Sequence, residues 1–492
     1  MLTFGMPATL LAYFFILLLI SRHTSRRGGT GNDAFFNAKR SSPWWLVAFG
    51  MIGASISGVT FISVPGWAGA TGMTYLQMCL GFIPGYAIVA FLLLPLYYRL
   101  KLTSIYSWLG MRFDRTTHHT GSTFFIVSKI LGAAARLYII CVVLEMFVVT
   151  PLLHLEGVAA FALTAGTVLA LIWLYTRRSG IMTIVRTDAL QTLCLLLAAV
   201  GILFAAMEQL RLDFPGLMNL VKESDMGRVW EWDASSRQAF WRQFISGAFI
   251  VVVMTGLDQD MMQKNLTCRT LKDAQKNMMG YGLCFLPVNA LFLILGIVLY
   301  TLCAQQGIAA SGDRLLPTLV QSGCLGEWVV IPFTIGIVAA AFSSADSALT
   351  ALTTTICIDL LHTDQVPDAE AERKRRRIHL ALIPVFMVCL IALRLAGGDN
   401  ILNTIYVMAS YTYGPLLGLF AFGLFTRRKC GGRKVWLVCL AAPAICGALD
   451  FLAPRLWNYT FGYELLLLNG TLTFAGLWLL GCSGVDLPKK KS

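Results

Sequence analysis

Long apolar runs follow one another along almost the whole chain. Thirteen stretches of about 17 or more mostly apolar residues can be counted, each long enough to cross about 30 Å of hydrocarbon as a helix rising 1.5 Å per residue. These runs predict an all-α membrane protein with about thirteen transmembrane helices. The expected spans are 3–21, 44–70, 75–98, 122–149, 157–175, 181–206, 243–262, 279–304, 328–358, 378–396, 401–425, 435–453 and 463–482.

The composition excludes an ordinary soluble globule. Apolar residues make up 57% of the 492 residues and charged residues only 13%, with a mean hydropathy of +0.69. A soluble chain carries about 25% charged residues, so this chain lacks the polar surface to cover itself in water. No low-complexity stretch or separate soluble domain interrupts the runs, and we expect one membrane domain over 1–492.

The distribution of positive charge predicts the orientation. The net charge of +13 would suggest a polyanionic partner in a soluble protein. With the N-terminus outside, however, most of the 39 Lys and Arg fall in inside segments. This bias predicts an N-out, C-in protein of the cell (inner or plasma) membrane with an odd number of spans, and it argues against nucleic-acid binding. We expect the basic run 373–377 to contact lipid phosphates.

The first run is predicted to be a retained helix. No Lys or Arg precedes it, whereas Arg22, Arg26 and Arg27 follow it, which reverses the charge order of a secretory signal. The longest outside loop, 207–242, is interpreted as a solvated cap, with a lid as the alternative. No CxxC pattern occurs, and only Cys303 and Cys324 are candidates for a disulfide.

Residues 53–66 carry glycine, proline and hydroxyl side chains where a lipid-facing helix would carry leucine. A helix of this composition is expected to break, and a break frees main-chain carbonyls, which are hard oxygen ligands for a dehydrated alkali cation. Tight packing of small residues against neighbouring helices is the alternative. This segment alone leaves both interpretations open.

A face of small and hydroxyl residues marks the span 328–358. Ala340, Ser343, Ser344 and Ser347 are spaced i, i+3, i+4 and i+7, with Asp346 at the edge of that face. A carboxylate in mid-membrane is costly unless it is paired or ion-bound, and hard cations prefer oxygen ligands. The face therefore predicts a sodium site. The alternative is hydroxyls bonded to their own helix beside a protonated Asp346.

Two further spans carry buried charge. Asp188 either pairs with Arg186 or faces the same cavity as Asp346. Arg136 lies near mid-depth among small residues; its planar guanidinium fits a carboxylate ligand, with an internal ion pair as the alternative. Lys129, two turns earlier on the same face, is expected to snorkel.

Five stretches occur in a recognisable order. They are SGVTFI at 57–62 with PG at 65–66, LPLYY to TSIY at 94–106, TDALQ at 187–191, GLDQ with QK at 256–264, and SSADSAL at 343–349. Together these stretches resemble the sodium:solute symporter family, which contains bacterial sodium/galactose, sodium/proline and sodium/sialic acid transporters. The resemblance covers nearly the whole chain.

The resemblance implies a LeuT-like core of two inverted five-helix repeats. These would be 44–206 and 243–425, after an extra N-terminal helix and inside loop (1–43) and before two C-terminal helices (426–492). The first helix of each repeat would break at the membrane midplane, with substrate and ion between the breaks. We expect one break within 53–66 and the other near Ser246, Gly247 and Gly256.

The resemblance also implies specific ligands. A first sodium would bind the carbonyls of Gly53, Ile56 and Ala340 and the hydroxyls of Ser343 and Ser344. Gly53 departs from the usual Ala, without harm if only its carbonyl serves. A second sodium would use the side chains of Ser343, Asp346, Ser347 and Asp188. The expected substrate contacts are Ser57, Thr60, Gln77, Arg136 and Asp258.

The implied function is sodium-coupled secondary active import of a small polar organic solute. Arg136 matches the position where the family's sialic acid transporters bind a carboxylate, which favours a sugar acid such as sialic acid or another organic acid. The alternatives are a neutral sugar, amino acid or vitamin, a proton-coupled carrier that uses Asp188 or Asp346, and a non-transporting sensor. An enzyme is disfavoured, because the six histidines fall in loops or at expected helix ends, and no protein partner is required.

Overall fold

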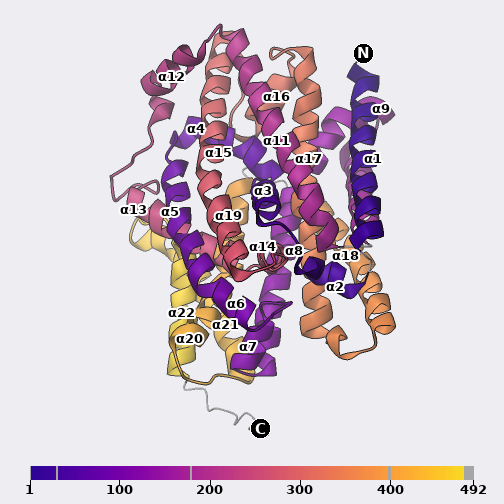
Figure 1. Ribbon diagram of the computed structural model, residues 1–492. Helices are drawn as coiled ribbons and strands as arrows, with labels where there is room; N and C mark the ends of the chain where they lie inside the picture. Colours follow the sequence, from indigo (N-terminus) through magenta and orange to yellow (C-terminus); the bar gives the residue numbers. More distant parts are fainter. Residues whose placement is uncertain (1, 29–30, 178–179, 397–400, 481–492) are drawn as a thin grey trace.

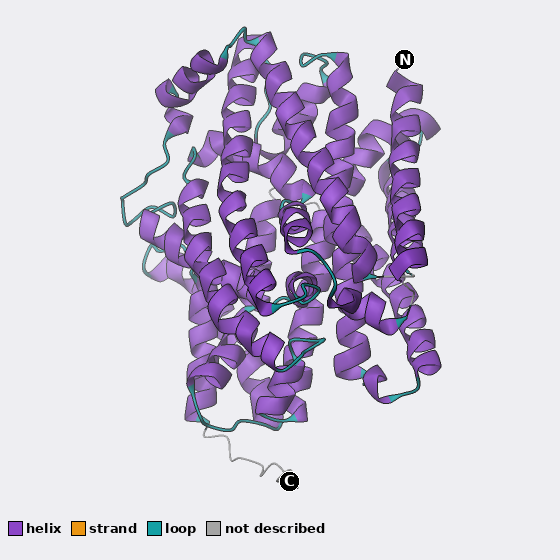
Figure 2. Cartoon of the chain, in the orientation of Figure 1, coloured by secondary structure: helices purple, strands orange, loops and turns teal. Residues whose placement is uncertain are grey.

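The structure is a computed structural model that describes residues 2–28, 31–177, 180–396 and 401–480. The described residues form helices and turns, with one isolated bridge between Ser42 and Cys268 and no strand (Figure 2). This confirms the all-α prediction. A helix satisfies its own backbone hydrogen bonds, which a lipid environment demands.

Nine stretches in the described part of the chain are long and apolar enough to cross a membrane. Some continue through a single wide π-helical turn. They are α1 (Leu2–Gly28), α5 (Tyr75–Ile88) with α6 (Leu94–Arg99), α8 (Arg115–Leu144) with α9 (Thr150–Leu153), α10 (Gly157–Thr176), α11 (Ile181–Gln209), α15 (Leu271–Gln306), α17 (Val330–Thr355), α18 (Asp368–Ala396) and α21 (Arg433–Leu456).

Two helix pairs are sharply bent. α3 (Trp44–Ser55) and α4 (Gly58–Thr71) meet at 59°, and α13 (Phe240–Val251), extended by a π-helical turn to Gly256, meets α14 (Gln259–Asn265) at 70°. Counting each pair as one span raises the number of candidates to eleven. Both predicted breaks are therefore present, although Ser246 and Gly247 lie inside the continuous helix α13 and only Gly256 lies at the break.

Two expected spans are shorter than predicted. The run 401–425 divides at Tyr413 into α19 (Ile401–Thr412) and α20 (Gly414–Phe425), and α22 (Leu465–Leu479) covers most of 463–482, whose last two residues lie outside the described chain. The total of thirteen spans therefore stays a prediction. The remaining short helices are α2 (Asn32–Asn37), α7 (Ser107–Arg112), α12 (Phe214–Glu223) and α16 (Leu315–Gln321).

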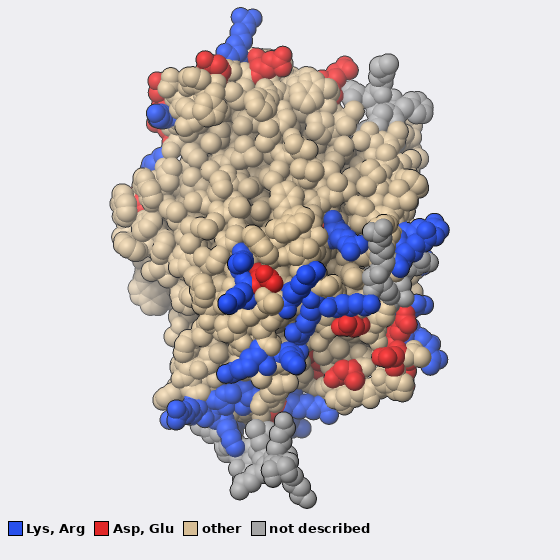
Figure 3. All heavy atoms as spheres, in the orientation of Figure 1, with Lys and Arg blue, Asp and Glu red and all other residues tan. Residues whose placement is uncertain are grey.

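The helices α11 and α17 run side by side through the centre of the molecule and contact α3, whereas α20, α21 and α22 stand together at one side (Figure 1). Figure 3 shows that Lys and Arg gather over the lower half of the visible face, below a broad band with few charges. This pattern agrees with the expected charge asymmetry. The N-out orientation itself remains a prediction.

One expected lipid contact is wrong. The side chain of Arg375 is only 1% exposed, and its guanidinium lies 4.3 Å from the centre of the Phe35 ring. Burial against an aromatic face favours a guanidinium through cation–π attraction, so Arg375 fastens α18 to α2. Arg373 and Arg376, in the same run, remain exposed. The thiols of Cys303 and Cys324 are both free.

Candidate ion and substrate site

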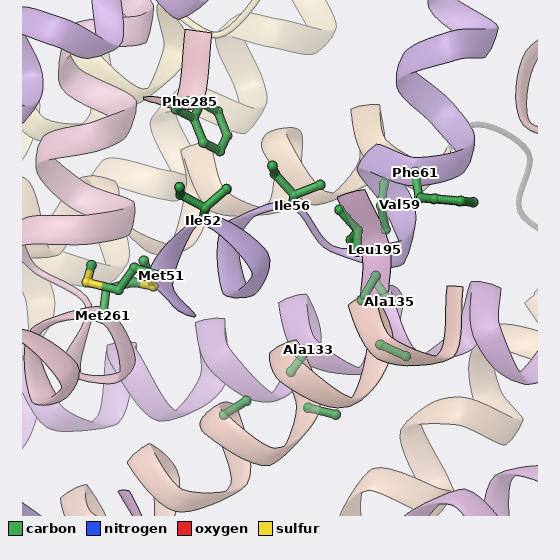
Figure 4. Packing of buried hydrophobic residues seen from close by; sticks show 14 of the residues in the cluster. Met51, Ile52, Ile56, Val59, Phe61, Ala133, Ala135, Leu195, Met261 and Phe285 are labelled. Atoms are coloured by element: carbon green, nitrogen blue, oxygen red, sulfur yellow. The ribbon is translucent and has the colours of Figure 1, made fainter. Parts of the chain in front are cut away.

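The first break exposes main-chain carbonyls within the protein. Ile56 has φ −80° and ψ 79°, and Ser57 is extended, so the helical hydrogen-bond pattern stops between α3 and α4. Figure 4 shows Ile56 on the unwound backbone between Ile52 and Val59. Ile56 and Ser57 are buried. Unwound backbone at this depth is tolerated only beside protein or a watery cavity, which is the environment predicted for a cation site.

Helix α17, which carries Ser343 and Ser344, contacts this break. Ser344 Oγ on α17 donates a hydrogen bond to the carbonyl oxygen of Ala54 at 3.2 Å. Ala340 and Ser343, one turn earlier and adjacent, are equally buried. The structure therefore brings together the two elements that carry the predicted first sodium ligands, Gly53, Ile56, Ala340, Ser343 and Ser344.

Gly53 is required for more than its carbonyl. Its N–H donates to Thr192 Oγ1 of α11 at 3.1 Å, and a Cβ at this position would lie only 2.1 Å from that oxygen and 3.1 Å from the Thr192 Cα. A contact with backbone cannot be relieved by a rotamer change. Glycine therefore sets the close approach of α3 to α11.

Asp188 has a partner that the sequence did not indicate. Its Oδ2 lies 2.8 Å from Nζ of Lys264 on α14, and its Oδ1 accepts from Ser343 Oγ at 2.8 Å. The alternative pairing with Arg186 is wrong, because Arg186 donates instead to Thr24 Oγ1 at 3.1 Å. Asp188 and Lys264 are both almost fully buried, so each ion offsets the desolvation cost of the other.

Asp346 is also engaged. It accepts hydrogen bonds from the Tyr175 hydroxyl of α10 at 2.6 Å and from Ser347 Oγ at 3.2 Å. The residues predicted for a second sodium thus lie on the facing helices α11 and α17, linked by the bond between Ser343 and Asp188. Every one of these oxygens is buried.

A cavity lies between the two breaks. Ser57 and Thr60 line it from the first broken helix, Arg136 from α8, and Asp258 from the second break. Four of the five predicted substrate contacts therefore face one space. Phe82, Tyr86, Phe285 and Met408 supply apolar walls, and such a mixture of apolar walls and a few polar groups is typical of a small-molecule site.

Gln77 is the exception among the predicted contacts. Its side-chain amide donates to the carbonyl of Gln238 at 2.9 Å and accepts from the Glu231 N–H at 3.1 Å, and it is absent from the cavity lining. Gln77 is fully buried beneath the 207–242 loop. In this structure it holds that loop to α5, and a direct contact with substrate stays a prediction.

Arg136 lines the cavity without a direct partner. Among the described residues, no hydrogen bond or ion pair joins its guanidinium to another group, and none of its nitrogens is a buried atom left without a partner. The guanidinium therefore faces the open cavity, where it is available to an anionic ligand. This geometry favours the ligand interpretation over the internal ion pair.

Lys129 does not snorkel. Its ammonium lies 3.1 Å from Asp258 Oδ2 and 2.7 Å from Asp260 Oδ2, and its side chain is only 5% exposed. Asp258 also accepts from the Tyr413 hydroxyl at 2.6 Å. The sequence signal for this cluster was the spacing of Lys129 and Arg136 on one face of α8, but the acidic partners of Lys129 come from a break more than a hundred residues away.

Hydrogen bonds join two of the recognised stretches, residues 94–106 and residues 256–264. The Tyr97 hydroxyl donates to the carbonyl of Gly256 at 3.0 Å and the Tyr106 hydroxyl to that of Leu257 at 2.6 Å, while Gln259 accepts from the Ile105 N–H at 2.9 Å. The two tyrosine bonds satisfy carbonyls that the second break leaves without helical partners. The loop after α6 therefore holds the second break in place.

Two broken helices facing a polar cavity within an all-helical membrane domain define a membrane transporter of LeuT-like fold. The family model of the sodium:solute symporter family matches residues 35–431. The chain therefore belongs to the sodium:solute symporter family and is a multi-pass membrane protein. This confirms the resemblance seen in the sequence.

Similar proteins support this placement. The human sodium/iodide cotransporter is 26% identical over 84% of this chain and 65% of its own length. The sodium/sialic acid symporter SiaT of Proteus mirabilis is 23% identical over 90% of this chain and 88% of its own length. A solved substrate-bound, outward-open structure of a Na+-coupled sialic acid symporter aligns over 99% of this chain and 100% of its own, with 19% identity and a TM-score of 0.81. This chain thus spans just under two thirds of the sodium/iodide cotransporter.

Proposed function

We propose that this protein couples the inward movement of sodium to the uptake of a small organic monocarboxylate across the cell membrane. The observation that carries the proposal is Arg136, a guanidinium without a direct partner in the cavity between the two breaks. Arginine binds carboxylates through two parallel hydrogen bonds. A sugar acid such as sialic acid is the first candidate, because the relative SiaT is named for that solute.

The contacts of the charged side chains around the cavity leave Arg136 as the group available to a carboxylate. Four charged side chains line the cavity, Lys129, Arg136, Asp258 and Asp260. Lys129 lies between the two aspartates, within ion-pair distance of both, so its ammonium is already engaged. Among the described residues, Arg136 contacts neither aspartate directly, and its planar guanidinium can bind a carboxylate through two hydrogen bonds.

We assign the first sodium to the junction of the first break and α17. Main-chain carbonyls of Gly53, Ile56 and Ala340 with the hydroxyls of Ser343 and Ser344 would form an all-oxygen set, which suits a hard alkali cation. Because the Ser343 hydroxyl donates its hydrogen bond to Asp188 Oδ1, the lone pairs of its oxygen are left for a cation. A second sodium would use the side chains of Asp188, Ser343, Asp346 and Ser347.

In this mechanism sodium binding ties the segment around Ile56 to α17 and favours the state that accepts substrate. Coupling requires that sodium bind the two conformations with different affinity, since equal binding shifts nothing. Each sodium that enters down a potential of 100 mV contributes about 2.3 kcal/mol, before the concentration gradient is added.

The test is uptake of labelled sialic acid and of a panel of small monocarboxylates into proteoliposomes that contain the purified protein. We expect concentrative uptake under a sodium gradient and none under a potassium gradient. Arg136→Gln should abolish uptake of the carboxylate, with Arg455→Gln, on the far end of α21, as the matched control. Equal uptake by Arg136→Gln and the unmodified protein would contradict the assignment.

The same vesicles separate the alternatives. If the protein takes up a neutral sugar, an amino acid or an uncharged vitamin, and Arg136→Gln does not change that uptake, that solute would replace the carboxylate as the proposed substrate. Uptake driven by a pH gradient without sodium would indicate a proton-coupled carrier. Saturable binding without accumulation would indicate a sensor.

A further inference from the structure

The ammonium group of a buried lysine, Lys264, contacts Asp188, the carboxylate that we assign to the second sodium site. Lys264 Nζ lies 2.8 Å from Asp188 Oδ2 and 3.9 Å from Asp260 Oδ1, and the lysine side chain is only 1% exposed. The ammonium group therefore sits in direct contact with one acid and within a short movement of a second. A carboxylate oxygen in contact with an ammonium cannot at the same time give its full charge to a sodium ion.

The second acid has an unused acceptor. Asp260 Oδ1 is buried and has no hydrogen-bond partner among the described residues, whereas Asp260 Oδ2 lies 2.7 Å from Lys129. A buried acceptor left without a partner is costly, and an ammonium that moved by about 1 Å would satisfy it. Asp188 and Asp260 thus offer Lys264 two alternative positions.

We infer that Lys264 is an internal competitor of sodium for Asp188. Sodium binds to Asp188 when the Lys264 ammonium moves from Asp188 to Asp260, and the ammonium returns when sodium leaves. This inference rests on the proposed sodium coupling and adds a regulating residue to the second sodium site. Because the protein provides its own replacement cation, the empty site does not leave Asp188 as an uncompensated buried charge.

The same chain of charges reaches the substrate cavity. Lys129 contacts Asp258 and Asp260 and lines the cavity two turns from Arg136. A carboxylate held by Arg136 attracts the Lys129 ammonium away from Asp260, and Asp260 then attracts Lys264 more strongly. Substrate binding thereby favours sodium at Asp188, and by linkage sodium favours substrate by the same factor.

The test measures sodium-22 binding to the purified protein without any substrate. Asp260→Asn removes the charge that draws Lys264 away, so we expect the half-saturating sodium concentration of the proposed site at Asp188 to rise at least about fivefold. Lys264→Met removes the competitor, so the same concentration should fall by about fivefold or more. Asp450→Asn is the matched control and should leave sodium binding unchanged, because this carboxylate lies near the C-terminal end of α21 and accepts from Tyr411.

The double variant separates competition from a general electrostatic effect. If Lys264 is the competitor, Asp260→Asn has no further effect once Lys264→Met is present, whereas a general field predicts additive shifts. Additive shifts, or weaker sodium binding in Lys264→Met, would overturn the inference. Lys264→Gln replaces Lys264→Met if the latter does not fold. Unchanged sodium binding in Asp260→Asn alone would also overturn the inference. A protein that binds no sodium before any substitution would overturn the proposed function as well.

Discussion

The two helix breaks satisfy their exposed polar groups with different kinds of partner. At the first break, carbonyls and hydroxyls around Ile56 and Ser57 meet the serines of α17, and no charged side chain belongs to the broken segment itself. At the second break, Asp258 and Asp260 meet two buried lysines. Neutral oxygens suit a cation that must bind and leave, whereas paired charges suit an element that must be held in position.

This difference separates two roles: the first break is suited to bind and release sodium, and the second break is suited to hold charged groups in fixed contact. A site made of neutral dipoles tolerates an empty state, because hydroxyls can bond within their own helix. A cluster of four charges needs every member, because removal of one leaves an uncompensated charge in a buried place. We therefore expect substitutions at the second break to lower stability in addition to any effect on sodium binding, and substitutions at the first break to change sodium affinity with little loss of stability.

The largest effect is expected for Lys129→Met. It removes the cation shared by Asp258 and Asp260, and loss of one partner of a buried ion pair costs about 3–5 kcal/mol. The free energy of unfolding in mixed micelles measures this loss. Adding Asp258→Asn and Asp260→Asn to Lys129→Met should recover much of it, and a loss below about 1 kcal/mol would show that the cluster does not hold the break.

Gly53→Ala should follow, because its Cβ would overlap Thr192. Overpacking of this kind costs about 1–3 kcal/mol, and it should also separate α3 from α11 and weaken sodium binding. The control is Gly201→Ala on α11, where the nearest atom to the new Cβ is 4.0 Å away. Equal stability of the two variants would contradict the close approach described for Gly53.

Ser343→Ala combined with Ser344→Ala tests the first break without a large loss of stability. Removing two hydroxyl ligands should raise the half-saturating sodium concentration for transport about tenfold or more, since about 1.4 kcal/mol corresponds to a factor of ten. Thr334→Ala is the matched control, because among the described residues this hydroxyl of α17 bonds only to the carbonyl of Val330, within its own helix. Unchanged sodium dependence in the double variant would remove sodium from this junction.

The smallest effect on sodium-coupled transport is expected for Gln77→Ala. The substitution removes hydrogen bonds to residues 231 and 238, each of which contributes about 1 kcal/mol. Amide hydrogen exchange in the 207–242 loop should accelerate, while sodium affinity stays unchanged. A loss of substrate binding with unaltered exchange would return Gln77 to the cavity.

The sequence could predict the broken helix at 53–66 because its composition is local evidence. Glycine, proline and hydroxyl residues replace leucine within one span, and the serines of 343–347 fall on one helical face by spacing alone. The second break lacked this signal, since it lies at Leu257 after a π-helical turn and has no cluster of small residues. The same reason explains why Ser246 and Gly247 marked the wrong place.

The partners of the charged residues could not be predicted. Arg186 is two residues from Asp188, yet Asp188 pairs with Lys264, and Lys129 meets acids on α14 and at the second break. Gln77 likewise bonds a loop that is about 150 residues away in the chain. Sequence spacing reports which side chains share a face, but not which other helix presents its charge to that face.

The sequence by itself determined that this protein is surrounded by lipid and which polar residues lie within its spans. Both follow from hydrophobicity and helical periodicity, which can be judged over a few turns of one helix. The tertiary structure alone decided which carboxylate each lysine neutralises and which hydroxyl turns toward the break. Ion pairing in a buried environment depends on distances of a few ångströms between separate helices, and those distances exist only after the helices have packed.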